Sequence, residues 1–509
     1  MTVSTGRFLA GAALLLLVAG AAYATGTTEQ AAESIRLRIM MPNGSAVPFP
    51  GDADMNDNQW ANIYTDAFPE YDFQWEILPR DGYTEKKNLA MASGDMPDII
   101  GGVGLPDVVK WSEQEIIQPL DDVVAQHIPM WDEWVVANGS HTGGRYNGKQ
   151  WLFTAPSNTK ENGVMSFVRK DWLDNLGLEM PRTTDELFEV LKAFTFDDPD
   201  GNGKQDTWGM GGAKGLTRMS YVYNPHGVTG FDEWWPLDDE IAPVAILPGM
   251  KDALAFLKRA SDAGVIDPDL YVQSIGDYAG KVRAGAYGVI DFWANGVINV
   301  FLPAMKQLDA SVDIRLIDPP LRGPQGHQLV QTRPPAPGQT YAAPITNQHP
   351  EAFARVFNWL LEGSANTFNY GTEEGLHYHQ VGEYQVEVGR QSDPDWALRT
   401  PYRIMWGYGQ MLPGQKSVAR WEAIAATGRT TPDFPRQIAL QGEYGVANRY
   451  VVPSPLVIEK WADLKTRFDE VKVDIVLGNA PLSAFDEWVE FFWANGGREM
   501  VDEVTSLNQ

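Results

Sequence analysis

Alternating apolar and polar residues near the start of the chain predict a first β-strand. In residues 34–41, apolar side chains occupy every second position before the run ends in two methionines. A second strand is predicted at residues 73–78, and a short buried strand at 98–100 is followed by two glycines. Helical patterns lie between these strands, so this part of the chain is expected to be α/β with a largely parallel sheet.

Apolar stripes with helical spacing predict three further helices. The first follows Thr183, which forms a capping box with Glu186. The second begins at Pro350 and the third near Pro481, and glycines end both. The stripes are Leu187, Val190, Leu191 and Phe194; Phe353, Val356, Phe357, Leu360 and Leu361; and Phe485, Trp488, Val489 and Phe492. Core packing is the usual role of such stripes. Three tryptophans in these helices are therefore discounted as ligand contacts: Trp359, Trp488 and Trp493.

A proline-rich stretch interrupts the pattern. Residues 318–338 hold six prolines, which exclude a central strand or helix. We expect this stretch to be a stiff connection at a crossing between two lobes.

The composition excludes several classes of protein. The chain has 509 residues, with 67 acidic and 40 basic side chains and a formal net charge of −27. This length fits two or three domains, or two lobes built from one interleaved chain. The acid excess argues against a general nucleic-acid-binding protein. Because the sequence has no cysteine, disulfides, thiolate metal sites, cysteine nucleophiles and lipid attachment through cysteine are excluded.

The N-terminal segment has the pattern of a secretory signal. Arg7 precedes an apolar run from Phe8 to Ala22, and Ala22-Tyr23-Ala24 matches a cleavage site. The alternative is a transmembrane anchor, but the strongly apolar core is shorter than the ~20 residues of a spanning helix. We expect residues 1–24 to be a signal peptide and 25–33 a flexible leader. The mature protein is then periplasmic or extracellular, without a lipid anchor.

One acidic loop has the spacing of a calcium site. Residues 198–207 read Asp-Pro-Asp-Gly-Asn-Gly-Lys-Gln-Asp-Thr, with oxygen side chains at positions 1, 3, 5 and 9 and glycine at position 6. This is the arrangement of an EF-hand loop, in which position 7 contributes only its backbone carbonyl. Gly209 stands at position 12 instead of the bidentate glutamate. The alternative is a glycine-rich turn without metal. Because the loop follows the capped helix directly, a structural ion is more natural than a catalytic one.

Signals for catalysis are weak, whereas aromatic residues outside the stripes suggest a carbohydrate site. The sequence has no G-x-S-x-G, P-loop or H-E-x-x-H motif. Trp293 follows a predicted strand that ends at Asp291, and Trp406 follows Arg403. Flat aromatic faces beside a few polar groups suit the face and hydroxyls of a sugar, although packing is an equally good interpretation of each tryptophan. Arg403 would suit a uronate carboxylate through a bidentate bond.

Several segments, taken in order, resemble one family. Residues 92–100 read Ala-Ser-Gly-Asp-Met-Pro-Asp-Ile-Ile, and residues 168–178 read Val-Arg-Lys-Asp-Trp-Leu-Asp-Asn-Leu-Gly-Leu. Residues 147–151 (Asn-Gly-Lys-Gln-Trp), 284–289 and 350–352 add further matches. Together they resemble the extracellular solute-binding proteins of ABC importers, in the sugar-binding family that includes the maltodextrin-binding proteins. Long members with an EF-hand-like loop, such as the alginate oligosaccharide-binding proteins, are most similar.

The resemblance implies a set of site residues. Structural Ca²⁺ would be held by Asp198, Asp200, Asn202, the carbonyl of Lys204, and Asp206, although Thr207 stands where the alginate binders have a glutamate. The ligand site would include, besides Asp291 and Arg403, the following residues: Asn43, Gly102, Tyr223, Asn224, Trp235, Trp293 and Trp406.

The resemblance also implies a type II periplasmic-binding-protein fold, in which two α/β lobes are joined by a hinge and the ligand cleft lies between them. Lobe 1 would comprise residues 34–158 and 315–400. Lobe 2 would comprise 159–314, with the calcium loop at 198–209, and 401–509 with the C-terminal helices.

The implied function is that of a substrate-binding component of an ABC importer. It would capture a carbohydrate, an oligosaccharide that could contain uronate, and deliver it to a membrane permease. The protein would be a monomer without enzymatic activity and without a nucleic-acid partner. Two alternatives stay open: the same fold binding a peptide or other polar solute, and a secreted carbohydrate-active enzyme.

Overall fold

The structure is a computed structural model of the chain. It describes residues 34–43, 49–137, 140–155, 164–229, 233–293, 296–332, 339–382, 384–388, 393–405, 417–427, 435, 443–449 and 454–508. The predicted signal peptide and leader, residues 1–33, lie outside the described residues, as does Trp406.

The first lobe is built on a sheet that the described residues form with the strand order β2-β1-β3-β14-β6. β1 pairs in parallel with β2 and β3, whereas β14 runs antiparallel to β3 and β6. The strands are β1 (Ile35–Pro42), β2 (Tyr71–Leu78), β3 (Ile99–Gly101), β14 (Thr340–Ala342) and β6 (Phe153–Thr154). The three strands predicted from the sequence are therefore confirmed, and they form the parallel part of the sheet.

Helices cover both faces of this sheet, and the residues near the end of β1 are buried on both sides. Leu37, Ile39 and Met41 pack in one cluster with α12, and Met40 points to the opposite face and packs with Trp111 of α3. The helices of this lobe are α1 (Gln59–Ala67), α2 (Tyr83–Ser93), α3 (Leu105–Glu113), α4 (Asp121–His127), α12 (Pro350–Trp359), α13 (Ala365–Tyr370) and α14 (Trp396–Arg399).

The second lobe is built on a separate sheet, of order β12-β7-β11-β8 in the described residues. β11 pairs antiparallel with β7 and parallel with β8. The strands are β7 (Val164–Arg169), β8 (Trp208–Met210), β11 (Tyr287–Trp293) and β12 (Ile314–Leu316). Around them lie α5 (Lys170–Leu176), α6 (Thr184–Phe196), α7 (Ser220–Tyr223), α8 (Pro248–Asp262), α9 (Ile275–Arg283) and α11 (Leu302–Leu308).

The predicted capping box sets the start of α6. The backbone N–H of Glu186 donates to Thr183 Oγ1 over 3.2 Å, and the N–H of Thr183 donates to Glu186 Oε2 over 3.2 Å. The predicted stripe is buried, with Leu187, Leu191 and Phe194 at 0% exposure. This anchored helix leads directly into the acidic loop at 198–207.

The C-terminal helices pack on the second lobe. They are α17 (Pro455–Leu477), α18 (Ala484–Phe492) and α19 (Arg498–Asn508), and they share a core cluster with α8. Gly496, with φ 93°, breaks the helical path between α18 and α19. Gly363, with φ 125°, does the same after α12. Both predicted stops are therefore kinks between consecutive helices, because glycine tolerates these positive φ values.

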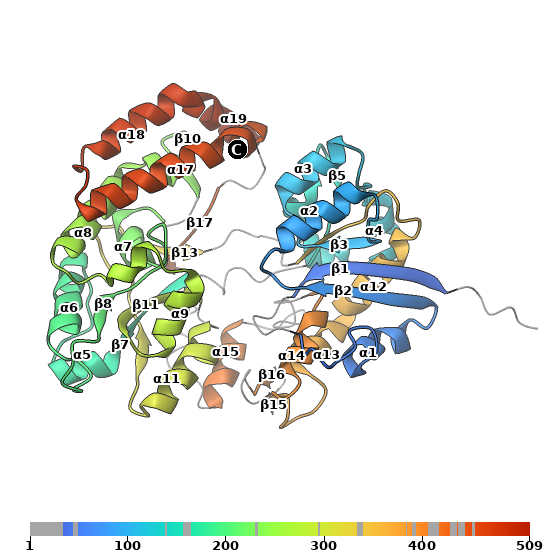
Figure 1. The fold of residues 1–509 in the computed structure, drawn as a ribbon, viewed down its shortest axis with the longest axis horizontal. Helices are drawn as coiled ribbons and strands as arrows, with labels where there is room; N and C mark the ends of the chain where they lie inside the picture. Colours follow the sequence, from blue (N-terminus) through green and yellow to red (C-terminus); the bar gives the residue numbers. More distant parts are fainter. Residues whose placement is uncertain are drawn as a thin grey trace, which may run out of the picture.

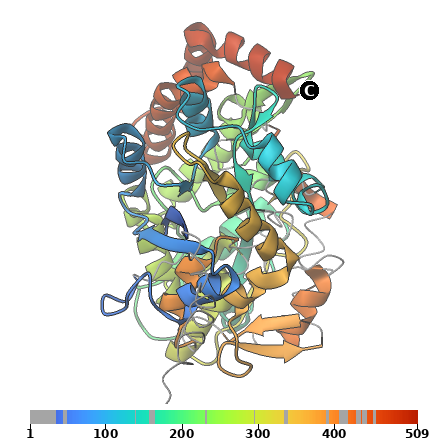
Figure 2. The same ribbon diagram turned by 90° about the vertical axis from the view of Figure 1, so that its right-hand side faces the viewer.

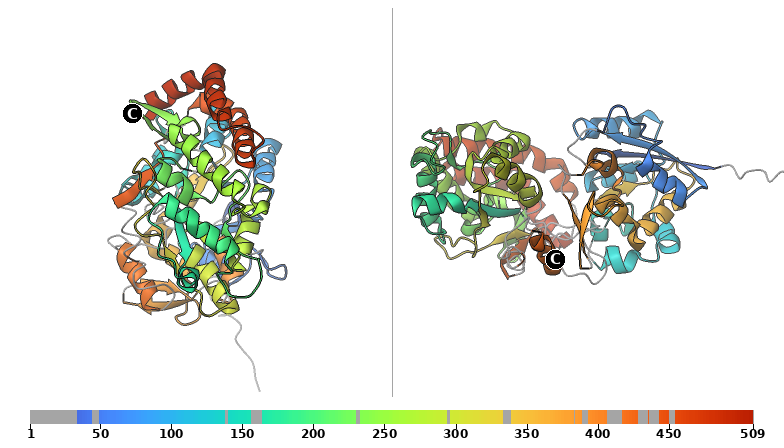
Figure 3. Two further views of the ribbon diagram at one scale, coloured as in Figure 1. Left: turned by 90° about the vertical axis from the view of Figure 1, so that its left-hand side faces the viewer. Right: turned by 90° about the horizontal axis from the view of Figure 1, so that it is seen from below.

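The two lobes lie side by side (Figures 1 and 3). Figure 1 shows the carboxyl end of β1 pointing toward the second lobe. Figure 2, which views the first lobe from its outer side, shows α12 lying across it and a β-hairpin at one end. That hairpin is β15 (Tyr378–Val381) with β16 (Tyr384–Glu387). The other small strand pairs are β4 (Arg145–Tyr146) with β5 (Lys149–Gln150), and β9 (Trp234–Leu237) with β10 (Glu240–Pro243).

The chain crosses between lobes more than once. It leaves the first sheet after β6 and enters the second at β7. Ile317, Leu321 and Leu329 pack in the core of the second lobe, and β13 (Val330–Thr332) pairs there with β17 (Gly445–Ala447). Tyr402, Ile404 and Met405 pack in the core of the first lobe. We therefore propose crossings after residues 332 and 405, where the sequence interpretation has 314 and 400.

None of the helices in the described part of the chain combines the length and the apolar character that a bilayer-spanning helix requires.

Candidate ligand-binding site

One edge of the second sheet gathers several of the predicted ligand residues. β7 begins there and β11 ends there, so Trp293 pairs with Val164 and Asp291 with Ser166. The turn before α7 brings Arg218 to the same edge, and Ser220, the first residue of α7, follows it there. We call Arg218, Ser220, Asn224, Asp291 and Trp293 the edge cluster.

Asp291 is the buried charge of the edge cluster. Its side chain is 0% exposed, and its Oδ2 accepts the backbone N–H of Ser220 over 2.7 Å. Burial raises the pKa of Asp291 to about 6, although the Ser220 N–H and the charge of Arg218 both act to lower it. The other oxygen, Oδ1, accepts no hydrogen bond from the described residues. The edge therefore holds a buried carboxylate oxygen whose hydrogen-bonding capacity the described residues leave unused.

Trp293 and Arg218 form a stack beside that carboxylate. The Arg218 guanidinium carbon lies 4.4 Å from the ring centroid of Trp293 and 4.8 Å from that of Phe292. Arg218 is 4% exposed, whereas Trp293 is only partly buried. A partly exposed indole backed by a buried cation is a platform on which a flat apolar face can pack.

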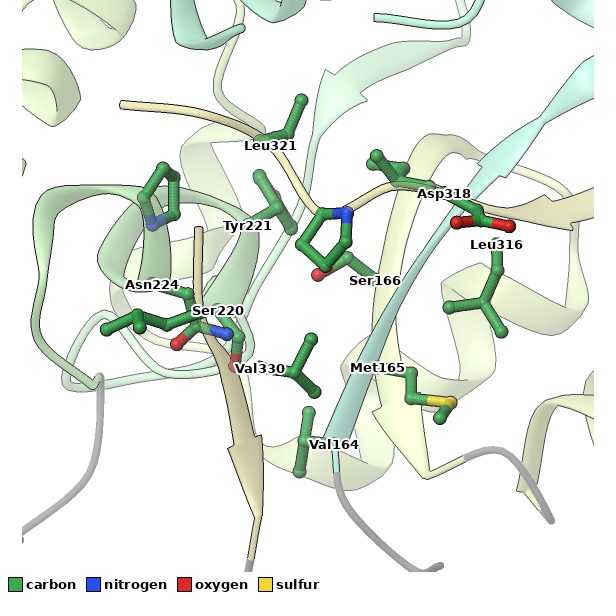
Figure 4. A pocket seen from close by; sticks show the side chains of 14 residues that line it. Val164, Met165, Ser166, Ser220, Tyr221, Asn224, Leu316, Asp318, Leu321 and Val330 are labelled. Carbon is green, nitrogen blue, oxygen red and sulfur yellow. The ribbon is translucent and has the colours of Figure 1, made fainter. Parts of the chain in front are cut away.

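Asn224 links the edge cluster to a small cavity. Its Oδ1 is buried and accepts no hydrogen bond within the described part of the chain. Figure 4 shows Asn224 and Ser220 around this cavity with Val164 and Val330. The cavity has a volume of about 40 Å³, which is room for water. It is too small for a sugar ring, so it is an extension of a site rather than the whole of one.

Two further predicted residues meet in the first lobe, at the carboxyl ends of β1 and β3. Asn43 follows β1, is 5% exposed, and donates its backbone N–H to Leu78 O over 2.7 Å. Gly102 follows β3 with φ +66°, and a Cβ there would lie 3.2 Å from Pro42. Only glycine fits this close approach at a positive φ without strain. Because β1 points toward the second lobe (Figure 1), Asn43 and Gly102 lie at the edge that faces it.

The structure does not bring three other predicted residues to these edges. The Tyr223 hydroxyl donates to Leu216 O over 2.8 Å, inside the core of the second lobe. Trp235 is 7% exposed and donates its Nε1 hydrogen to Glu233 Oε2 over 3.0 Å. Both side chains pack as core residues do.

Arg403 is the third of these residues, and its guanidinium donates hydrogen bonds within the first lobe. The side chain is 5% exposed. It donates to Phe368 O over 2.9 Å, to Asn369 O over 2.7 Å and to Glu387 Oε1 over 3.1 Å. These bonds hold α13 to the β15–β16 hairpin. The contact of Arg403 with a ligand carboxylate therefore has no support from this geometry, and Trp406, its proposed neighbour, lies outside the described residues.

Sequence reasoning missed Arg218 and Ser220. Arg218 has φ +67°, and Leu216 two residues earlier has φ +56°. Left-handed conformations are uncommon for residues other than glycine, asparagine and aspartate. Nothing in the residue types at 216–220 indicates this turn, so no spacing motif could have placed Arg218 on Trp293.

The acidic loop after α6 is folded around its own side chains. The Asn202 side chain donates to Asp200 Oδ2 over 2.8 Å and to Asp206 Oδ1 over 3.2 Å. Asp198 accepts the backbone N–H groups of Asn202 and Gly203 over 3.1 and 2.9 Å. Partial burial and the neighbouring Asp198 and Asp206 raise the pKa of Asp200.

This donor set fits a calcium ion in chemistry, although it is not drawn together as a metal site. In the described residues, no group of three or more His, Cys, Asp or Glu side chains is arranged to hold a metal. The Asn202 side chain bridges two of the carboxylates through its nitrogen, and its oxygen accepts the backbone N–H of Lys204 over 2.8 Å. A Cβ at Gly209 would lie 2.2 Å from Leu191 O. The missing glutamate at position 12 therefore has a packing cause: this position lies against α6.

Comparison with known proteins then identifies the family. The bacterial extracellular solute-binding protein family matches residues 50–365, which is more than half of the chain. The chain belongs to the bacterial extracellular solute-binding proteins. Members of this family are binding proteins rather than enzymes.

Two relatives match this solute-binding protein, one over most of its length and one over less than half of it. It is 24% identical to a polygalacturonan/rhamnogalacturonan-binding protein of Bacillus subtilis (strain 168), over 85% of this chain and 84% of the relative. It is 28% identical to a fructooligosaccharide ABC transporter substrate-binding protein of Streptococcus pneumoniae serotype 4, over 42% of each chain.

Solved structures share the fold of this solute-binding protein. The S. pneumoniae protein FusA in complex with kestose superposes with a TM-score of 0.71 at 19% identity, covering 92% of this chain and 98% of that one. The alginate-binding protein AlgQ2, in a structure without calcium ion, has a TM-score of 0.69 at 18% identity, covering 94% and 98%. The type II fold with two α/β lobes, expected from the sequence, is thereby confirmed.

Proposed function

We propose that this solute-binding protein is the substrate-binding component of an ABC importer and that its ligand is an oligosaccharide. The observation that carries the proposal is the edge cluster. A partly exposed tryptophan is backed by a buried arginine, and the same cluster holds two buried oxygens, Asp291 Oδ1 and Asn224 Oδ1, that accept no hydrogen bond from the described residues. An aromatic face with hydrogen-bond acceptors next to it matches the apolar face and hydroxyls of a sugar.

The relatives support the same class of ligand. Those reported above carry polygalacturonan, rhamnogalacturonan, fructooligosaccharide, kestose and alginate in their names. Some of these sugars are acidic and some neutral, so the relatives do not choose between a uronate and a neutral oligosaccharide. A peptide or another polar solute is the alternative ligand for the same fold.

We place the ligand between the lobes, with the carboxyl ends of β1 and β3 on one side of it and the edge cluster on the other. Asn43 and Gly102 would contact it from the first lobe, and Asn224, Asp291 and Trp293 from the second. Closure by a hinge motion over the crossing segments would enclose the sugar. The protein would act as a monomer and release the intact sugar to a membrane permease, rather than cleave it.

Calcium would serve as a structural ion in the loop after α6. Asp198, Asp200, Asn202, the Lys204 carbonyl and Asp206 supply the hard oxygens that Ca²⁺ prefers. Bound Ca²⁺ would offset two of the three negative charges that Asp198, Asp200 and Asp206 bring together between α6 and β8. One neighbour in fold is a FusA EF-hand mutant, and another is AlgQ2 without calcium ion. These descriptions belong to those proteins, and they motivate the test in this one.

We also propose export through the segment 1–24. A mature chain that begins near residue 25 would then work in the periplasm or outside the cell. The absence of cysteine from the sequence argues against an anchor attached through a cysteine thioether.

A thermal-shift panel tests the proposed function. The melting temperature would be measured with oligogalacturonides, alginate oligosaccharides, kestose and other fructo-oligosaccharides, and with short peptides as the opposing class. Ligands that bind only the native state raise it. We expect at least one oligosaccharide and no peptide to do so. A response to peptides alone would replace the carbohydrate proposal, and chromatography that finds a shortened sugar after incubation would favour an enzyme.

A further inference from the structure

Arg218 occupies an unusual position for a charged side chain. It is 4% exposed, and its backbone has φ +67°. A buried cation and a left-handed backbone at a non-glycine residue each cost free energy, and such strain persists where the surrounding structure requires that conformation. The turn therefore holds this side chain in one place against an intrinsic preference.

The guanidinium lies against two rings at once. Its central carbon is 4.4 Å from the centroid of Trp293 and 4.8 Å from that of Phe292, and the two rings are themselves in edge contact with centroids 4.8 Å apart. A planar guanidinium can stack on an indole, whereas a lysine ammonium has no plane to offer. Arg218 thus limits the rotation of a tryptophan that stands at the end of β11.

The same cation also acts on the carboxylate of the edge cluster. Its charge favours the ionised form of Asp291, and Asp291 Oδ2 holds the N–H of Ser220 two residues after Arg218. The turn, the strand end and the carboxylate are therefore tied together around one guanidinium.

We propose that Arg218 is the positioning residue of the ligand site: it fixes the indole plane of Trp293 so that the ring meets a sugar face without first being ordered. This inference rests on the proposed function. Pre-ordering a contact residue increases affinity, because the entropy of fixing it is not lost on binding. Arg218 acts through Trp293 and need not touch the sugar.

A second arginine in the same lobe supplies a matched control. The guanidinium carbon of Arg169 lies 4.4 Å from the ring centroid of Trp172, and Arg169 is 3% exposed. Arg169 ends β7, whereas Val164, the partner of Trp293, begins it. Five residues of strand separate the two positions by about 16 Å. Arg169→Met therefore removes a stack of the same distance, together with the ion pair of Arg169 and Asp171, at a position distant from the edge cluster.

The test is a double-mutant cycle. Titration calorimetry with kestose and with trigalacturonic acid would measure Kd for the wild type, Arg218→Met, Trp293→Ala and the double variant. Arg218→Met should weaken binding about tenfold in the wild-type background and less than about twofold when Trp293 is already alanine. Arg218→Lys should not restore affinity, and Arg169→Met should lower the melting temperature without changing Kd.

A spectroscopic measurement keeps the test independent of the sugar. The near-ultraviolet circular dichroism of the wild type minus that of Trp293→Phe isolates the band of a fixed Trp293. We expect this band to be lost in Arg218→Met and kept in Arg169→Met. An equal loss of affinity in both Trp293 backgrounds, or a band that survives Arg218→Met, overturns the inference. If neither sugar binds the wild type, the carbohydrate proposal loses support, while the band still decides the role of Arg218.

Discussion

At the scale of single residues, Asp291 gives the sharpest consequence of the site. Its carboxyl is fully buried and has a pKa of about 6, above the ordinary value of 3.8, chiefly because of burial. In the unfolded chain the same group ionises at its ordinary pKa. The folded state therefore holds this proton up to a higher pH, and the stability that protonation provides is lost as the pH rises through 6.

This loss of stability with rising pH gives a prediction for the variant Asp291→Asn. The free energy of unfolding of the wild type, minus that of the variant, should fall by about 2 kcal/mol between about pH 4.5 and about pH 7. Urea unfolding at several pH values measures the difference, and Asp239→Asn in the exposed β9–β10 turn serves as the background control. A difference that stays constant with pH would contradict a raised pKa at Asp291.

The residue scale also shows where sequence reasoning is weakest. The position of Asp291 and Trp293 at a sheet edge could be predicted, because both lie at the end of a buried strand, while their contact with a ligand stays a prediction. Tyr223, Trp235 and Arg403 have the right chemistry, but the folded chain offers their polar atoms nearby partners that a sequence does not display. Arg218 was missed for the opposite reason, because its role depends on a left-handed turn.

At the scale of elements, the loop between α6 and β8 carries the calcium prediction. Three aspartates lie within ten residues of chain, and Asn202 bonds to two of them. Calcium at a hundredfold excess over its Kd would stabilise the native state by about 2.7 kcal/mol. We expect a chelator to lower the melting temperature of the wild type.

Asp200→Ala combined with Asp206→Ala should abolish that chelator effect and lower the melting temperature in calcium. The control variant is Asp238→Ala with Asp239→Ala, which changes two exposed acidic residues in another turn. It should leave the effect of the chelator on the melting temperature intact. Differential scanning fluorimetry with metal analysis of the purified protein provides both measurements. An unchanged wild-type melting curve in chelator, with no calcium in the protein, would rule out the structural ion.

Regular elements were the most predictable part of the fold. The capping box at Thr183 and the apolar stripe that follows it depend on residues within one helix, so the sequence contains all the information. The ends of α12 and α18 could be predicted only in part. Glycine at positions 363 and 496 predicts a break, but only tertiary packing decides that another helix follows at once.

At the scale of the whole molecule, the order of family-like segments was sufficient to predict two α/β lobes. The crossings were harder to place. The proline-rich stretch marks a connection, but Ile317, Leu321 and Leu329 find apolar partners on the second lobe, so the chain stays there until β13. Burial of apolar side chains, rather than proline content, determines which lobe such a segment joins.

The acid excess of the chain, with a formal net charge of −27, says little about the ligand. Part of it lies in the loop at 198–206, and the edge cluster itself contains one carboxylate, Asp291, and one guanidinium, Arg218. A locally balanced site can accept neutral or acidic sugars, which is why both classes belong in the decisive test.

That test is isothermal titration calorimetry of the purified wild type with oligogalacturonides, alginate oligosaccharides and fructo-oligosaccharides. Trp293→Ala would be measured in the same way. Trp493→Ala would serve as the control, because it removes a partly buried tryptophan that stacks with Arg498 on the C-terminal helices. We predict saturable binding of at least one oligosaccharide, weakened about tenfold or more by Trp293→Ala, which is about 1.4 kcal/mol, and unchanged by Trp493→Ala. No binding of any oligosaccharide to the wild type, or equal binding to Trp293→Ala, would contradict the account.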